Sequence, residues 1–478
     1  MRRTVSVWVM TLLFFAGTMA VVVAVRASTS EISAVSKSVV DMPPARSNCQ
    51  MAYDSESNRI VMFGGGISDT WAYDVPNSNW QNMNPTNAPL ARHGHGMAYD
   101  FKADRVVLFG GYDAGITHVL DDTWTYDLNG NTWAEMMPSV SPPGRTGGQL
   151  VYDVQLDRVI LFGGHADASG NYLGKNDTWT YDLNSNTWNQ VTTATSPTLR
   201  AFSVMAYDME SDRVVLFGGM TEPDSLPDNE TWMYDPFNET WAKMTPTTSP
   251  TPRFGAAGAY DAKADRILVF GGGPNNGCND TWAYDLNADA WSEINTASSP
   301  SDRLSAMAYD VKSDLTVLFG GLWPWPFGDF NNETWVFDRG NSTWTMVLPD
   351  TVNPSVLITS PADGASLRSA NATVTGTASD NLGIEKVEVS LDNSNWTTAT
   401  GTTTWSTALS LKDGENTIYV RVTDTSGNIA WSTIHVNVST PGTPVWVWSL
   451  AVFGIAVAGA AAYVMIRRRG WFERDGRQ

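Results

Sequence analysis

Residues 105–133 read RVVLFGGYDAGITHVLDDTWTYDLNGNTW, and this pattern recurs six times along the chain. Each unit has an apolar run that ends in Phe-Gly-Gly, then a Thr-Trp pair, then a second Trp nine residues later. The phenylalanines are Phe63, Phe109, Phe162, Phe217, Phe270 and Phe319. Apolar runs of this length, separated by Asp, Asn and Gly, are typical of short strands joined by tight turns. The repeat therefore predicts an all-β architecture.

Two further residue types keep their place in every unit. A Tyr stands ten residues before each of the six phenylalanines, and an Arg opens each unit. The four β-rich runs of the second unit are expected near residues 95–99, 105–109, 123–126 and 133–137. Four strands repeated at a period of about 50 residues indicate a β-propeller, because one blade cannot bury both of its faces alone. The sequence thus predicts six blades.

The units resemble the kelch repeat, which has a double Gly after an apolar strand and spaced Tyr and Trp residues. The likeness covers residues 46–349. The chain enters the repeats on a first strand and leaves on a fourth. The ring is therefore expected to lack strand exchange between its ends, unless residues 36–40 add an edge strand.

One face of the expected propeller varies in length and the other does not. The segment from the repeat Tyr to Phe-Gly-Gly is constant, and so is the segment between the two tryptophans. The segment from Phe to the first Trp ranges from 8 to 17 residues. We call the four strands of each unit A to D in chain order, so the variable segment is the B–C loop, and the D–A connection between units lies on the same face. Variable loops on a fixed scaffold commonly build binding sites, so we expect the face formed by the B–C and D–A loops to bind the ligand. The alternative is that these loops vary without a function.

The repeated arginines have two interpretations. They are Arg46, Arg92, Arg145, Arg200, Arg253 and Arg303. An acid before each Thr-Trp could pair with them and lock the strands. Alternatively, they form a ring at the mouth of the propeller that accepts a carboxylate, and the resemblance supports this in part, since some kelch domains grip acidic peptides with arginines there.

Residues that break the repeat are the other candidate ligand contacts. His93 and His165 lie in units two and three, toward the variable face. The sixth B–C loop carries Trp323, Trp325 and Phe327 beside two prolines. An aromatic loop of this kind suits stacking on a sugar or docking a protein, and the alternative is a plug over its own blade. A metal site at the histidines would need convergent ligands, and whether the propeller holds a metal is left open.

After the propeller, residues 353–439 are rich in Thr, Ser and Val and alternate in polarity. About seven short strands without a Cys pair predict a β-sandwich. The segment resembles the immunoglobulin-like domains of prokaryotic surface proteins and is expected to act as a stalk. No cofactor is expected, although calcium at Asp380 or Asp424 is an alternative, since carboxylates suit that ion.

Charge and hydropathy predict a membrane topology. The chain has 478 residues and a net charge of -20, which disfavours nucleic acid as a partner. Uncharged apolar runs lie near both ends, and arginines flank them on the expected inner side. The expected division is a signal peptide or uncleaved anchor at 1–27, a linker at 28–45, the propeller at 46–349, the sandwich at 353–439, a single transmembrane helix at 445–466 and a cytoplasmic tail at 467–478. The body is then extracellular, on a single-pass protein of the cell membrane.

The function expected from these features is extracellular recognition or adhesion, with a protein or glycan as the partner. No P-loop, dinucleotide-binding, zinc-protease or serine-hydrolase motif occurs in the sequence. The alternatives are a carbohydrate-active enzyme of the oxidase or mutarotase type and a structural spacer. Cys49 and Cys278 are two units apart and are expected to be free thiols, because a disulfide needs Cα atoms within about 7 Å.

Overall fold

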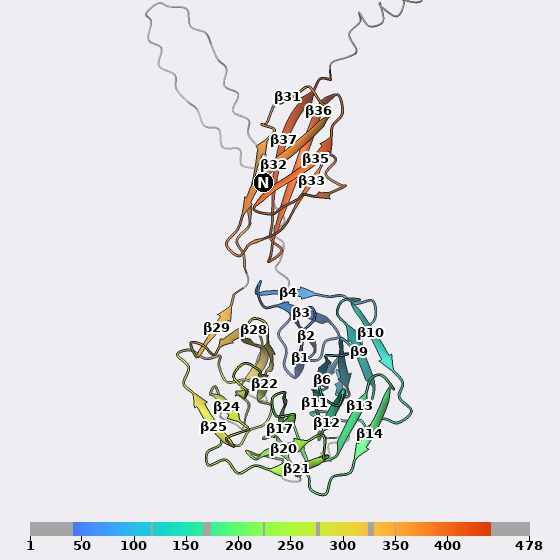
Figure 1. The fold of residues 1–478 in the computed structure, drawn as a ribbon, viewed down its shortest axis with the longest axis vertical. Coiled ribbons are helices and arrows are strands. Elements are labelled where there is room, and N and C mark those ends of the chain that lie inside the picture. Colours follow the sequence, from blue (N-terminus) through green and yellow to red (C-terminus); the bar gives the residue numbers. More distant parts are fainter. Residues whose placement is uncertain are drawn as a thin grey trace, which may run out of the picture. The chain divides into compact units, whose positions relative to one another are not determined.

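The computed structural model describes residues 42–115, 118–165, 174–222, 225–273, 278–323, 329–348 and 350–440. Within these ranges the regular structure is all β, as predicted. Six four-stranded antiparallel sheets form the blades of a propeller (Figure 1). Two further sheets form a separate domain after it.

Every blade is built from one continuous segment of chain. Blade 1 consists of β1 (Cys49–Asp54), β2 (Arg59–Gly64), β3 (Thr70–Asp74) and β4 (Asn79–Asn82). Blade 2 consists of β6 (Gly96–Asp100), β7 (Arg105–Phe109), β9 (Thr123–Asp127) and β10 (Thr132–Met136). Blade 3 consists of β11 (Gln149–Asp153), β12 (Arg158–Phe162), β13 (Thr178–Asp182) and β14 (Thr187–Val191). The predicted strands of the second unit are therefore confirmed to within a residue or two.

The remaining blades follow the same order. Blade 4 consists of β16 (Val204–Asp208), β17 (Arg213–Phe217), β20 (Thr231–Asp235) and β21 (Thr240–Lys243). Blade 5 consists of β22 (Ala257–Asp261), β23 (Arg266–Phe270), β24 (Thr281–Asp285) and β25 (Ala290–Ile294). Blade 6 consists of β26 (Ala306–Asp310), β27 (Leu315–Trp323), β28 (Asp329–Asp338) and β29 (Thr343–Val347). Short strands also pair outside the blade sheets: β5 (Arg92–His93) with β8 (Tyr112–Asp113), and β18 (Met220–Thr221) with both β15 (Arg200–Ala201) and β19 (Leu226–Pro227).

The hairpin turns explain the repeated tyrosines. In each A–B turn an Asn or Asp adopts positive φ, which these two residues tolerate better than most. Its side chain accepts a hydrogen bond of 2.7–2.9 Å from the hydroxyl of the Tyr five residues before it. The Asp after each Tyr is buried and accepts backbone N–H groups of the same turn, as with Asp100 and residues 102 and 103. The turn length is fixed because three groups must meet within it.

The second Trp of each unit joins neighbouring blades. Its indole N–H donates to the hydroxyl of the Thr before the first Trp in the preceding blade, at 2.8–3.0 Å. The six pairs are Trp80–Thr334, Trp133–Thr70, Trp188–Thr123, Trp241–Thr178, Trp291–Thr231 and Trp344–Thr281. All six tryptophans are at least 96% buried, so each bond is shielded from water. The same hydrogen bond thus connects every blade to the next.

The ring closes by the same contacts, and within the residues that the structure describes it does so without strand exchange. Trp80 of blade 1 bonds to Thr334 of blade 6, and β1 packs against β26. The sheet of blade 1 holds β1 to β4 and no further strand among the described residues. Residues 36–40, the candidate edge strand, lie outside the described residues.

The second domain is a two-sheet β-sandwich. One sheet contains β30 (Ser355–Ser360), β32 (Asn371–Ser379) and β35 (Thr404–Ser410). The other contains β31 (Ala365–Leu367), β37 (Ile429–Val438), β36 (Gly414–Asp424), β33 (Ile384–Ser390) and β34 (Thr397–Thr398). Both sheets contribute to one core, in which Val374 and Trp405 of the first meet Val387 and Ile418 of the second.

The predicted signal peptide at 1–27 and transmembrane helix at 445–466 lie outside the described residues. The part of the chain that the structure describes contains no helix long and apolar enough to cross a membrane.

Candidate functional site

The six repeated arginines are buried, with at most 3% of each exposed. Each guanidinium donates to the carbonyl of the first Gly after Phe and to the acid before Thr-Trp. Arg92, for example, donates to Gly110 O at 2.9 Å and to both oxygens of Asp122 at 2.7 Å. Its own carbonyl accepts from Gly66 N in the preceding blade. The arginines therefore connect blades.

The acid of each pair has a second donor. The indole N–H of the following Trp lies 2.7–2.9 Å from the same carboxylate in all six units. Burial opposes ionisation of Asp177, but hydrogen bonds and charge from Arg145, with Trp179, lower its pKa overall. These contacts support the interlocking interpretation of Arg46, Arg92, Arg145, Arg200, Arg253 and Arg303. The alternative of an open arginine ring fails because their guanidinium groups face blade partners instead of solvent.

The two candidate histidines lie apart from any convergent set of metal ligands among the described residues. His93 is half-buried in β5, and burial lowers its pKa. His165 is 4% exposed and packs edge-to-face on Phe202, with ring centroids 5.5 Å apart. Burial lowers the pKa of His165 to about 4, so it is neutral at pH 7. His165 is therefore a packing residue in this geometry, whereas the ligand contact proposed for His93 stays a prediction.

The aromatic loop of blade 6 extends from a hairpin longer than in the other blades. β27 and β28 continue to pair past Gly321, as far as Trp323 opposite Asp329. Phe330 in this extension is 54% exposed. Trp325 and Phe327 lie outside the described residues, so the proposed contacts of this loop stay a prediction.

At the end of the propeller axis on the B–C and D–A face, the backbone forms a belt of hydrogen bonds. The N–H of Gly94 donates to Asn48 O, Gly147 to Gly94 O, Phe202 to Gly147 O, and Gly255 to Phe202 O, at 2.7–3.1 Å. All five residues have positive φ. The Phe202 ring lies directly over Gly147, where an added Cβ would come within 3.1 Å of it. The cavity beneath the belt is about 70 Å³, so little of the axis opens here.

The opposite end of the axis opens into a larger, mainly apolar cavity, which we call the funnel. Its volume is about 540 Å³, and its wall carries the six repeat tyrosines with Met51, Met97, Met205 and Met307. Its rim is formed by Phe101, Met209 and Val311, which are 56%, 44% and 48% exposed. The A–B turns bear this rim.

The sequence carried a signal for the funnel that the loop-length argument missed. The residue two positions after the repeat Tyr sits at the tip of the A–B turn. Polar residues are common at such tips, yet four of the six are large and apolar. They are Phe101, Val154, Met209 and Val311. Constant loop length on this face hid a variable and apolar side-chain pattern.

Comparison with known proteins agrees with this architecture. The model of the KLHDC2/KLHL20/DRC7 Kelch-repeats domain matches residues 17–219 and 203–407. Adagio-like protein 1 of Oryza sativa subsp. japonica is 28% identical over 253 residues, covering 47% of this chain and 39% of that protein. Putative adagio-like protein 2 of the same plant is also 28% identical over 253 residues, covering 47% of this chain and 38% of that protein. The chain thus spans about two fifths of the length of these relatives.

A solved structure of a fungal alcohol oxidase of the AA5 family, in complex with copper, is also similar. It shares 14% sequence identity, with a TM-score of 0.44, and the match covers 83% of this chain and 98% of that one.

Proposed function

This chain belongs to the kelch-repeat family, and from that premise we propose that it is a recognition protein whose propeller docks a partner protein through the funnel. Kelch domains generally mediate protein–protein interaction. Membership of the family thus indicates the class of function, whereas the binding site has to be inferred from the surface residues of this chain.

The observation that carries the proposal is the apolar rim of the funnel. Phe101, Met209 and Val311 are each about half exposed around a cavity of about 540 Å³. Clustered apolar side chains on a soluble surface commonly mark interaction sites, and aromatic anchors dominate the binding energy of such sites. A partner with an apolar side chain that enters the funnel would bury both the rim and the wall.

The face formed by the B–C and D–A loops is the second candidate surface. Its support is the range of B–C lengths and the extended hairpin of blade 6, which presents Phe330 to solvent. A glycan or a protein suits that aromatic surface.

An extracellular oxidase or mutarotase has less support from the described residues. The ionisable groups in the funnel wall are mainly tyrosines, whose hydroxyls donate to turn carboxylates and amides. Burial raises the pKa of Tyr207, and the charges of Asp153 and Asp212 raise it further. A general acid or base works best with a pKa near the ambient pH, and these tyrosines are shifted away from it.

The proposed setting is the cell surface, with the immunoglobulin-like sandwich as a stalk. The support is the pair of apolar runs at 5–25 and 445–466 with their flanking arginines. Protease added to intact cells should remove the propeller and sandwich and spare the tail at 467–478. Cleavage of the tail alone under those conditions would contradict this topology.

A matched pair of variants tests the binding surface. We expect Met209→Ser/Val311→Ser at the funnel rim to abolish partner binding by the full chain, measured on a protein and glycan array. The control is Met137→Ser/Val140→Ser, which removes two exposed apolar residues of the same types from a D–A connection on the opposite face. If only the control variant loses partner binding, the binding site lies on the B–C and D–A face instead.

A further inference from the structure

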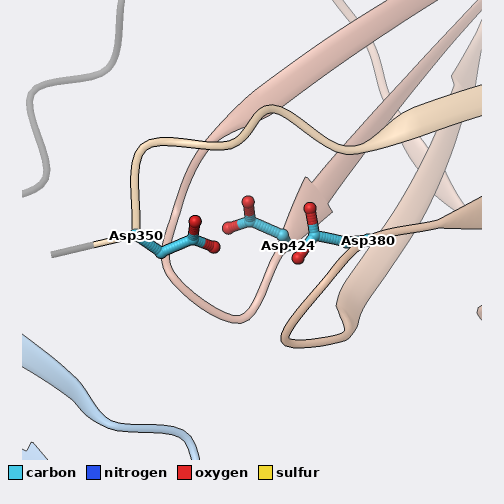
Figure 2. Close-up of side chains that lie close together, drawn as sticks. All are labelled: Asp350, Asp380 and Asp424. Carbon is cyan, nitrogen blue, oxygen red and sulfur yellow. The ribbon is translucent and has the colours of Figure 1, made fainter. Parts of the chain in front are cut away.

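Three carboxylates from distant parts of the sequence meet at one end of the sandwich. Asp350 precedes β30, Asp380 directly follows β32, and Asp424 is the last residue of β36. One carboxylate oxygen from each lies within 4.8 Å of the others. Figure 2 shows the side chains of Asp350 and Asp380 both directed toward Asp424.

The local backbone fixes the orientation of each carboxylate. Oδ1 of Asp424 accepts from the N–H groups of Ser426 and Asn428 at 2.8 and 2.9 Å. Oδ2 of Asp380 accepts from Leu382 N at 2.9 Å. Oδ1 of Asp350 accepts from the N–H of residue 352, also at 2.9 Å. The three side chains therefore converge because short turns hold them there.

Asn428 joins the segment before β30 to this arrangement. Its side-chain amide donates to Asp424 Oδ2 at 2.9 Å and to the carbonyl oxygens of Asp350 and Val352 at 3.2 Å. Asp350 is thus positioned by the same side chain that contacts Asp424. The cluster is therefore part of the hydrogen-bonded structure at this end of the sandwich.

Two oxygens of the cluster have no hydrogen-bond partner. Asp350 Oδ2 and Asp380 Oδ1 are both buried, and neither finds a donor among the described residues. Asp350 is 91% buried and Asp424 fully buried. Within the same part of the chain, no Lys, Arg or His forms an ion pair with any of the three aspartates. Buried carboxylates without compensation are strongly destabilising, and a bound cation is one way to compensate them.

We propose that Asp350, Asp380 and Asp424 bind a calcium ion. The donors are all oxygen, which fits a hard cation and disfavours zinc or copper, whose protein sites use His and Cys. Calcium takes 6–8 oxygens in adaptable geometry, whereas magnesium requires a near-ideal octahedron. Three carboxylates from separate loops, completed by water or carbonyls, match the less demanding ion.

The site goes beyond the proposed recognition function and gives the sandwich a role of its own. The ion ties the segment that enters β30 to the ends of β32 and β36. The sequence suggests calcium at Asp380 or Asp424 but does not point to Asp350, because nothing in it brings residue 350 beside residue 424. With all three ligands, calcium stiffens the point where the chain enters the stalk.

Calorimetric titration of the full chain tests the site. After treatment with EGTA, the chain should bind one calcium ion, and excess calcium should raise the melting temperature of the sandwich by several degrees. Asp350→Asn and Asp380→Asn should each lower calcium affinity at least tenfold. Both keep the backbone hydrogen bond and replace only the unpartnered oxygen. The control Glu415→Gln removes one charge from the exposed start of β36 and should bind calcium as the wild type does.

The stability of the variants in EGTA separates a metal site from a purely structural cluster. Without calcium, Asp350→Asn relieves carboxylate repulsion, so it should melt at or above the wild-type temperature, and with calcium it should melt below it. This reversal is the expected result. The proposal is overturned if wild-type protein takes up no calcium, if magnesium binds as tightly, or if both Asn variants retain wild-type affinity.

Discussion

Replacing Thr334 by Val should weaken the closure of the propeller. Val has nearly the same shape, so the substitution opens no cavity, but it removes the acceptor of the 2.8 Å bond from Trp80 Nε1. Thr334 is fully buried and Trp80 is 4% exposed, so water cannot replace the lost partner. An unsatisfied buried donor costs about 1–3 kcal/mol, and we expect the free energy of unfolding to fall by that amount.

Urea unfolding followed by tryptophan fluorescence measures this loss. Thr178→Val, which removes the matching bond to Trp241 within the ring, is the control for position. Because blades 1 and 6 are joined by the same Trp–Thr bond as blades 3 and 4, the two variants should be equally destabilised. In a double-mutant cycle, Trp80→Phe and Thr334→Val should show a coupling of about 0.5–3 kcal/mol. Additive losses, or a neutral Thr334→Val, would refute the claim that this bond closes the ring.

Three further predictions follow from the buried groups. Arg92→Met should reduce the free energy of unfolding in urea, because it leaves the Asp122 carboxylate without its guanidinium partner; the loss should stay below the about 3–5 kcal/mol of a fully buried pair, since 21% of the Asp122 side chain is exposed. Burial opposes ionisation of Glu230, but Lys243, Trp232 and Arg200 together lower its pKa to about 2. The ionised carboxylate therefore stabilises the folded state fully above pH 4.5, and this contribution is lost as the pH falls toward 2. Glu230→Gln should flatten this part of the pH–stability curve. Burial raises the pKa of Cys49 to about 11. In native protein at pH 8, Cys49 should therefore resist alkylation, while the half-buried Cys278 reacts. Rapid labelling of Cys49 would contradict its burial.

The sequence predicted the propeller well because its repeats report local requirements. A Tyr, an Asp and an Asn or Asp at fixed spacing satisfy one turn: the Tyr hydroxyl donates to the Asn or Asp side chain, and the other Asp accepts backbone N–H groups of the same turn. The acid-Thr-Trp triplet was equally informative. Its acid binds an Arg and its own Trp, while its Thr binds the Trp of the next blade. A residue that every blade needs can be recognised from the sequence alone.

The candidate site was less predictable, because ligand contacts depend on how blades are brought together. Loop length pointed to the B–C face, whereas the funnel arises from turn-tip residues of Phe101 type that are far apart in sequence. The arginines could be interpreted in two ways until their burial was known. Asp350 likewise joins Asp380 and Asp424 only through the fold of the sandwich.

Repetition also explains why the funnel is a better site than the arginine ring. A group that occurs in every blade and has its donors taken up by blade partners, as Arg145 has with Asp177 and Gly163, contributes to the scaffold six times over. Residues that differ between blades can distinguish one orientation of a ligand from another. At the turn tips the scaffold leaves the side chain free, and there the chain places Ser55 in blade 1 but Phe101 in blade 2 and Met209 in blade 4. At the proposed site, this asymmetric rim would give a partner one preferred orientation on a nearly six-fold ring.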